Sequence, residues 1–117
     1  MARKLVLASI LLCMTPLLAK RVRPHPVAPI VSDNIKYSAE GDGTTAYVVA
    51  ADAATGEIFW RAKIFHIHLK PWIEGDNQWV FISGLRLNGK NILVQDERSH
   101  CYSLDSMTRR VRKVPCR

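Results

Sequence analysis

Turn signals recur at short spacing along the chain and leave only brief segments between them. The turn clusters are 40–43, 52–56, 74–77, 96–99 and 105–108, together with the Asn-Gly pair at 88–89. An Asn-Gly pair is typical of a tight hairpin, because both residues tolerate the positive φ that such a turn requires. The segments between the turns are rich in β-branched and aromatic residues, and none keeps a helical periodicity. The strands expected from this pattern are 35–38, 46–51, 57–66, 79–87, 91–95, 101–104 and 110–114. The sequence therefore predicts an all-β fold, a small antiparallel β-meander of about six or seven strands.

Residues 1–19 have the three parts of a cleavable signal peptide. Arg3 and Lys4 form the positive end, residues 5–14 are mostly apolar, and Ala19 provides a small residue at the expected cleavage site. A membrane-spanning helix needs about 20 apolar residues, and this run is shorter and is followed by a proline. We therefore expect an exported protein, periplasmic or secreted.

Cys13 raises the alternative of a lipid-anchored protein. Leucines precede it where a lipoprotein signal has small residues, so lipidation is disfavoured. After the signal peptide, residues 20–30 contain three prolines and several basic residues, which favours an extended leader. Residues 31–117 then form the predicted single β domain. A chain of this size has room for one core but not for a deep cleft between domains.

Positive charge gathers at both ends of the mature chain. Loss of Arg3 and Lys4 with the signal lowers the formal net charge from +7 to +5, and all ten acids lie between residues 32 and 105. Basic ends can solubilise a protein or bind anionic cell-surface material. The basic residues at the two ends are Lys20, Arg21, Arg23, Arg109, Arg110, Arg112, Lys113 and Arg117.

Two segments of the chain share an outline. Residues 47–60 place an apolar strand before Asp-x-x-Thr-Gly and a second apolar strand that ends in tryptophan, with the turn residues Asp52, Thr55 and Gly56. Residues 100–111 repeat this outline with Asp105 and Thr108. The aspartate can accept backbone N–H bonds within the turn, and glycine supplies positive φ.

This motif resembles the blade repeat of the pyrroloquinoline-quinone-type (PQQ-like) β-propellers, as found in small secreted bacterial proteins with one or two repeats. The second copy departs from the pattern, because Arg109 replaces the glycine and Lys113 the tryptophan. A propeller needs four or more blades, and the quinone-binding residues of the full-length enzymes have no counterpart here. The resemblance implies a fold element, and we expect neither the quinone nor another cofactor.

Cys101 and Cys116 remain as an even pair once Cys13 is removed, in a compartment where disulfides persist. If the second hairpin has the register of the resembling one, Asp105 faces Arg110 and Cys101 faces Val114. Cys116 would then lie diagonal to Cys101, with about 7 Å between the Cα atoms. This separation is at the margin for a disulfide, and we expect the bridge to form because the compartment is oxidising.

His66 and His68 are the candidate metal ligands. Residues two apart in a strand share a face, so both imidazoles would project together and could bind copper or zinc. The alternative is a pair of histidines on a solvated strand face. His25 or His100 could supply a third ligand.

Aromatic and acidic residues provide weaker signals. Trp60 and Trp79 lie in apolar runs and are expected in the core, whereas Trp72 follows Pro71 in an expected loop and could contact carbohydrate. The paired acids Asp96 and Glu97 and the cluster of Glu74 and Asp76 fall in turn clusters, and no nucleophile motif accompanies the serines.

The sequence thus predicts a non-enzymatic exported β domain that acts by binding or structural association. The partner would be another envelope or secreted protein, or anionic cell-surface material held by the basic tails, and not a nucleic acid. The alternatives are a small copper- or zinc-binding protein and a carbohydrate- or envelope-binding module.

Overall fold

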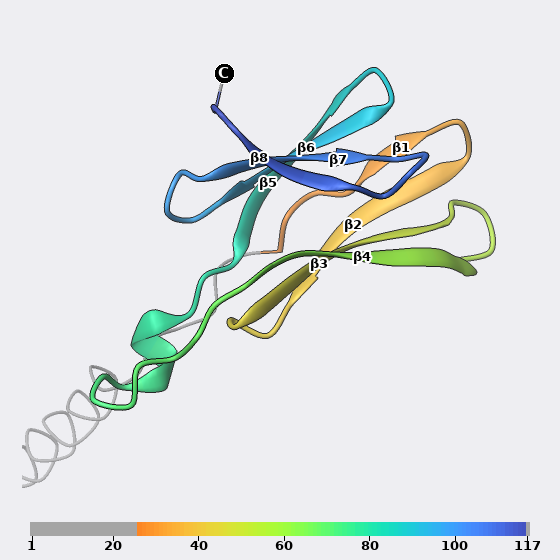
Figure 1. Cartoon of the computed structure of the whole chain (residues 1–117). Coiled ribbons are helices and arrows are strands. Elements are labelled where there is room, and N and C mark those ends of the chain that lie inside the picture. The colour runs from red at the N-terminus through yellow and green to blue at the C-terminus, as the bar shows by residue number, and fades with distance from the viewer. Residues whose placement is uncertain (1–25, 117) are drawn as a thin grey trace, which may run out of the picture.

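The computed structural model describes residues 26–116 and confirms an all-β fold (Figure 1). Two antiparallel sheets of four strands each follow one another along the chain, and each is a simple meander in sequence order. Sheet 1 contains β1 (Ile30–Ser32), β2 (Ile35–Gly41), β3 (Thr45–Asp52) and β4 (Ile58–His66). Sheet 2 contains β5 (Ile82–Asn88), β6 (Asn91–Asp96), β7 (Cys101–Asp105) and β8 (Val111–Val114). The predictions for residues 1–25, including the signal peptide and His25, lie outside the described residues.

Strand β1 was not expected, and it begins inside the segment that the sequence assigned to the leader. Its three residues pair with β2 across a two-residue turn, in which Asp33 and Asn34 both have positive φ. Strong strand formers follow directly after Pro29, where the proline pattern ends. Val27, further back, packs against the core. A strand this short has too little alternation to be recognised by its pattern.

The segment 67–81 divides the expected single meander into two sheets. Both of its ends bind the β2–β3 turn: Ile67 N–H donates to the Thr44 carbonyl at 2.8 Å, and Val80 N–H donates to the Gly43 carbonyl at 2.9 Å. Residues 79–81, expected in a strand, precede β5. The backbone of Val80 bonds to the β2–β3 turn, and the Phe81 carbonyl accepts the N–H of Glu97 in the β6–β7 turn at 3.0 Å, so neither pairs with a strand. Between the two ends lies one described 3₁₀ turn, η2 (Gly75–Gln78). No helix within residues 26–116 has the length and apolarity that crossing a membrane requires.

One core lies between the two sheets, which are stacked one above the other in Figure 1. Ile92, Leu104, Val48 and Val94 are the largest fully buried side chains, and they come from both sheets. Phe65 of β4 stacks on Tyr102 of β7 across this interface, with 5.6 Å between the ring centroids. Packing between the sheets therefore holds the two meanders together as one unit.

The sheets pack face to back. Ala50 and Ser103 are equivalent, since each lies two residues before the aspartate of its turn. Ala50 belongs to the core between the sheets, as does Leu104. Ser103 alternates with Leu104 along β7, so it lies on the opposite side of its sheet. The face of sheet 2 that packs on sheet 1 is therefore the equivalent of the face of sheet 1 that points away from the core.

Candidate functional site

The two similar segments form the same hairpin in the two sheets, between the third and fourth strands. Asp52 Oδ1 accepts backbone N–H bonds from Ala54 at 2.8 Å and Thr55 at 3.1 Å. The Thr55 hydroxyl oxygen accepts the N–H of Glu57 at 3.2 Å. Gly56 has φ 81°. These contacts are the turn chemistry that the motif predicts.

Asp105 repeats this geometry in the second hairpin. Its Oδ1 accepts the N–H groups of Met107 at 2.8 Å and Thr108 at 3.1 Å, and the Thr108 hydroxyl oxygen accepts the N–H of Arg110 at 3.3 Å. Arg109, at the position of Gly56, takes φ 63°. The turn chemistry is thus retained without the glycine, and both aspartates hold their turns.

Hydrogen bonds to these aspartates lower their pKa values. The N–H groups of Thr55 and Ala54 lower the pKa of Asp52, and those of Thr108 and Met107 lower that of Asp105. A third aspartate, Asp42, has a similar role before β3. The N–H groups of Thr45 and Thr44 and the Thr44 hydroxyl lower its pKa to about 2. All three carboxylates favour the ionised form because they accept hydrogen bonds from the folded backbone.

Cys101 and Cys116 form a disulfide, with 5.2 Å between their Cα atoms. The expected register is confirmed, because Cys101 faces Val114 and the Asp105 N–H donates to the Arg110 carbonyl at 2.9 Å. The Cα separation is shorter than a diagonal pair would have, because β8 ends at Val114 and the chain beyond it is free to turn toward Cys101. The bridge fixes the end of the described chain at the edge of sheet 2.

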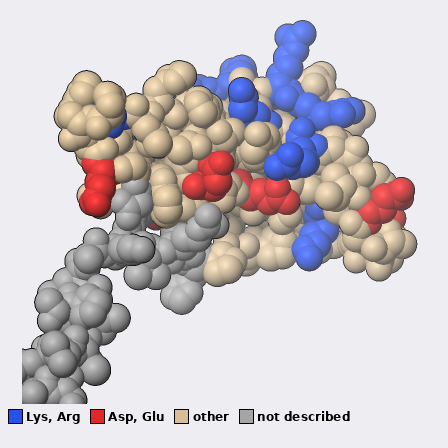
Figure 2. Space-filling view, turned by 90° about the horizontal axis from the view of Figure 1, so that it is seen from below, with Lys and Arg blue, Asp and Glu red and all other residues tan. Residues whose placement is uncertain are grey.

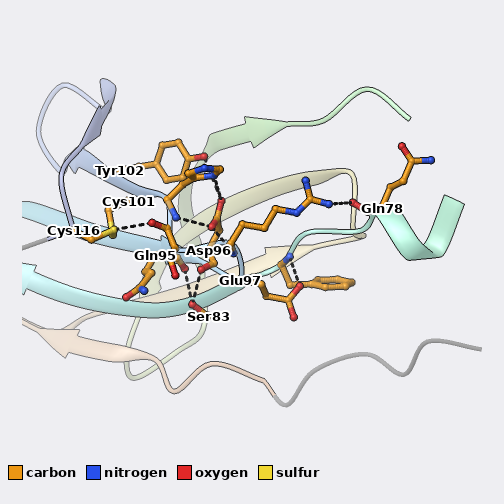
Figure 3. A network of polar contacts seen from close by, with 12 residues as sticks. Gln78, Ser83, Gln95, Asp96, Glu97, Cys101, Tyr102 and Cys116 are labelled. Atoms are coloured by element: carbon orange, nitrogen blue, oxygen red, sulfur yellow. Dashed lines mark hydrogen bonds and ion pairs between the residues drawn. A yellow bond between two sulfur atoms is a disulfide. The ribbon is translucent and has the colours of Figure 1, made fainter. Parts of the chain in front are cut away.

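Asp96 is the centre of a polar network beside this disulfide (Figure 3). It is 3% exposed, and its Oδ1 accepts the N–H groups of Arg98 at 2.8 Å and His100 at 2.9 Å. Its Oδ2 lies 3.3 Å from His100 Nδ1 and 3.5 Å from the Tyr102 hydroxyl. Burial, and then the charge of Asp96, raise the pKa of Tyr102. The network satisfies a buried carboxylate and closes the β6–β7 turn.

His66 and His68 lie close together, with 5.1 Å between the ring centroids. His66 ends β4, and its Nδ1 lies 2.7 Å from the Thr45 hydroxyl. Both imidazoles are exposed. Within residues 26–116, no group of three or more His, Cys, Asp or Glu side chains is placed to hold a metal ion. Metal binding by this pair stays a prediction.

Trp72 is 77% exposed and lies in the loop that the sequence assigned to it. The side-chain amide of Gln78 holds this loop: its Oε1 accepts the Lys70 N–H at 2.7 Å, and its Nε2 donates to the carbonyls of Lys70 and Ile73. Trp60 packs against the core, and Trp79 contacts Gly43 and Phe81. The three tryptophans therefore do not form a common binding platform.

The side of sheet 2 that faces away from sheet 1 carries a different set of residues, and we call it the outer face. Its members alternate along each strand with residues that pack in or against the core, such as Leu85, Ile92 and Leu104. Strand register places Arg86, Leu93, Ser103 and Arg112 in one row across the four strands. The other members of the outer face are Gly84, Asn88, Asn91, Gln95, Cys101, Asp105, Arg110 and Val114.

The outer face is hollowed. A hollow of about 170 Å³ lies at the disulfide end, lined by Gly84, Arg86, Gln95 and Cys116 among others. A second hollow, of about 620 Å³, includes Arg110 and Arg112 in its lining. The two hollows leave room for a ligand that lies along the outer face.

Positive charge dominates the outer face. Lys90 Nζ lies 3.6 Å from Asp105 Oδ2, which balances one charge of each sign. Across the part of the chain that the structure describes, no ion pair includes Arg86, Arg110 or Arg112. Figure 2 shows the opposite side of the molecule, from below sheet 1, where Lys and Arg side chains gather toward the upper right of the view and Asp and Glu lie in a band across its middle. The outer face offers three guanidinium groups that the fold itself does not use in ion pairs.

Sequence reasoning missed this site, although it singled out the basic C-terminal segment. Arg110 and Arg112 are two residues apart, which places them on one face of a strand. Arg86 belongs to an expected strand far away in the sequence, and only pairing of β5 with β6, β6 with β7 and β7 with β8 brings it into the row of Arg112. The alternation of Arg110 and Arg112 with Val111 in the last expected strand is the signal that could have suggested a basic face.

Comparison with protein-family models, with curated proteins and with solved structures returned no match to this chain.

Proposed function

We propose that this protein is a non-enzymatic exported binding domain that holds anionic material of the cell surface on the outer face of sheet 2. The observation that carries the proposal is the set Arg86, Arg110 and Arg112, which lies on a hollowed face without acidic partners among the described residues. Guanidinium groups bind carboxylate and phosphate groups by paired, charge-assisted hydrogen bonds. Arg110 and Arg112 belong to the basic C-terminal residues expected to make this contact, and Arg86 of β5 adds a third cation beside them.

Two further observations support the proposal. The disulfide between Cys101 and Cys116 is consistent with an oxidising, exported environment. The proposed location is therefore periplasmic or secreted. One position that is apolar in sheet 1 is polar on the outer face of sheet 2: Ala50 corresponds to Ser103, and each lies two residues before the aspartate of its own turn. Polar and charged residues on this face, such as Ser103 and Arg112, disfavour stacking of a further apolar sheet and suit a polar ligand.

The resemblance to PQQ-like repeats stays a prediction about the fold element. It is supported by the equivalent place of the two hairpins in two four-stranded sheets. No step of the proposed function depends on it.

The test is binding of long polyanions, polygalacturonate and polyphosphate, by calorimetry at low and moderate salt. We expect the variant Arg86→Gln/Arg110→Gln/Arg112→Gln to lose on the order of a hundredfold in affinity. The control Lys36→Gln/Lys63→Gln/Lys70→Gln removes the same formal charge elsewhere and should lose much less. Equal losses in the two variants would show that only net charge matters, and no binding by the wild type would refute the proposal.

A second candidate function is copper or zinc binding at His66 and His68, favoured by the 5.1 Å between their rings. His66→Ala and His68→Ala should each weaken binding of either metal without loss of the fold. Calorimetry that detects no binding of the wild type at micromolar metal would exclude this function.

A further inference from the structure

The hollow at the disulfide end of the outer face combines three kinds of chemical group. Arg86 supplies a guanidinium, and Gln95 supplies an exposed amide that can both donate and accept hydrogen bonds. Leu93, Val114 and Pro115 supply apolar surface. A volume of about 170 Å³ suits one small ring or chain unit.

A sugar acid presents the groups that complement this lining. Its carboxylate matches the planar fork of a guanidinium, its hydroxyls match an amide, and its C–H face matches aliphatic side chains. We infer that the hollow binds one uronate unit of an acidic polysaccharide, with Arg86 on the carboxylate and Gln95 on the hydroxyls. This inference rests on the proposed function, because Arg110 and Arg112 would hold the neighbouring units of the same polymer.

Other anionic partners fit this face less well. Single-stranded nucleic acids bind on aromatic side chains that stack with bases, and the outer face carries none. A membrane surface calls for exposed large hydrophobic residues beside the cations. Most of those among the described residues, including Ile58, Phe59 and Trp72, belong to sheet 1 or to the loop after it. The exception is Met107, which lies in the β7–β8 turn at the end of sheet 2 and not on the outer face. A polysaccharide needs neither feature.

Gly84 makes the hollow open to a direct test. It lies in β5, and a Cβ added there would meet no atom within 4 Å. Gly84→Val therefore fills space in the hollow with a residue that strands favour, and it leaves every charge in place. Arg86→Lys is the complementary change, because it keeps the charge but removes the paired hydrogen bonds. Ser38→Val in β2, within the other sheet, is the control for added bulk.

The experiment measures binding of a galacturonic acid trisaccharide, of the neutral maltotriose and of long-chain polyphosphate to the full mature protein by calorimetry. Thermal unfolding verifies that each variant is folded. We expect the wild type to bind the trigalacturonate and not maltotriose. Gly84→Val and Arg86→Lys should each weaken trigalacturonate binding by about tenfold or more, whereas Ser38→Val should not. Polyphosphate should bind Gly84→Val about as well as the wild type.

The outcomes separate this inference from the proposed function. Polyphosphate binding without trigalacturonate binding would overturn the uronate site and leave the anion-binding face standing. Unchanged trigalacturonate binding by Gly84→Val would place the sugar outside the hollow and also overturn the inference. Failure of the wild type to bind any of the anionic probes would overturn both.

Discussion

The guanidinium group of Arg109 lies over the indole ring of Trp60, with 5.7 Å between Cζ and the ring centroid. Trp60 belongs to β4 of sheet 1, and Arg109 lies in the turn before β8 of sheet 2. Arg109 also has φ 63°, at the position where the first hairpin has Gly56. One residue therefore combines an unfavourable backbone conformation with a cation–π contact that joins the two sheets.

Substitution of Arg109 should separate these two effects. Arg109→Ala keeps the positive φ and loses the contact, so we expect the free energy of unfolding to fall by about 1 kcal/mol. Arg109→Gly also loses the contact but relieves the backbone, so its loss should be smaller. Urea denaturation measures both variants, with Trp60→Leu as the background that removes the ring. An equal loss in the two variants would show that backbone strain is absent here.

Gly43 should tolerate no side chain. It has φ +100°, and an added Cβ would clash with the indole ring of Trp79. Because conformation and space both oppose a side chain, we expect Gly43→Ala to lower the unfolding free energy by about 2–4 kcal/mol. Gly89→Ala is the matched control, since Gly89 has φ +63° with no atom within 4 Å of an added Cβ. A thermal-melt comparison in which both variants lose the same stability would contradict the packing of Trp79 on Gly43.

Removal of the disulfide should cost substantial stability. The bridge joins residues 15 apart, and closing a loop of this length contributes about 3 kcal/mol in the chain-entropy model. We expect Cys101→Ser/Cys116→Ser to lose about this amount in urea denaturation. Thiol titration of the denatured, unreduced mature protein should find no free thiol, and two thiols per chain would contradict the bridge.

Stability should decline in acid. Asp42, Asp52 and Asp105 have lower pKa values in the folded protein than in the unfolded chain, so the unfolded chain binds protons first as the pH falls. Their contribution is complete above their ordinary pKa of 3.8 and is lost as the pH falls toward about 2, the folded value for Asp42. The unfolding free energy should therefore decrease across this range.

Asn substitution tests this pH dependence, because an amide oxygen still accepts the turn hydrogen bonds but does not titrate in this range. The variant Asp42→Asn/Asp52→Asn/Asp105→Asn should show a flatter profile of urea midpoint against pH between about 2 and 4 than the wild type. Asp33→Asn, at the β1–β2 turn, serves as the single-charge control. A profile of the triple variant as steep as that of the wild type would assign the acid sensitivity to other groups.

Much of the fold could be predicted because the turns are local. An aspartate followed by N–H groups two and three residues later closes its own hairpin, as Asp52 and Asp105 do. The register that this closure imposes on β7 and β8 also places Cys101 opposite Val114. Each of these features depends on a few residues adjacent in the sequence, which is why the pattern sufficed.

The candidate site could not be predicted in the same way. The outer face of sheet 2 includes the apolar residues Leu93 and Val114, and the side that faces the core includes Lys113 at its edge. The alternation of apolar and polar residues therefore did not show which face of sheet 2 would be covered. Metal and aromatic signals drew attention to His66, His68 and Trp72, which lie outside this face.

The sequence by itself determined the strand class, most strand positions, the equivalent hairpin turns and the cysteine pairing, because these depend on backbone preferences and short-range hydrogen bonds. The tertiary structure alone decided that the strands divide into two sheets, that β1 exists, and that sheet 2 covers sheet 1 face to back. The division follows from hydrogen bonds between residues 67–81 and the β2–β3 turn. Burial of Val48, Ile92 and Leu104 between the sheets selects which faces meet, and so leaves Arg86 and Arg112 together on the outside.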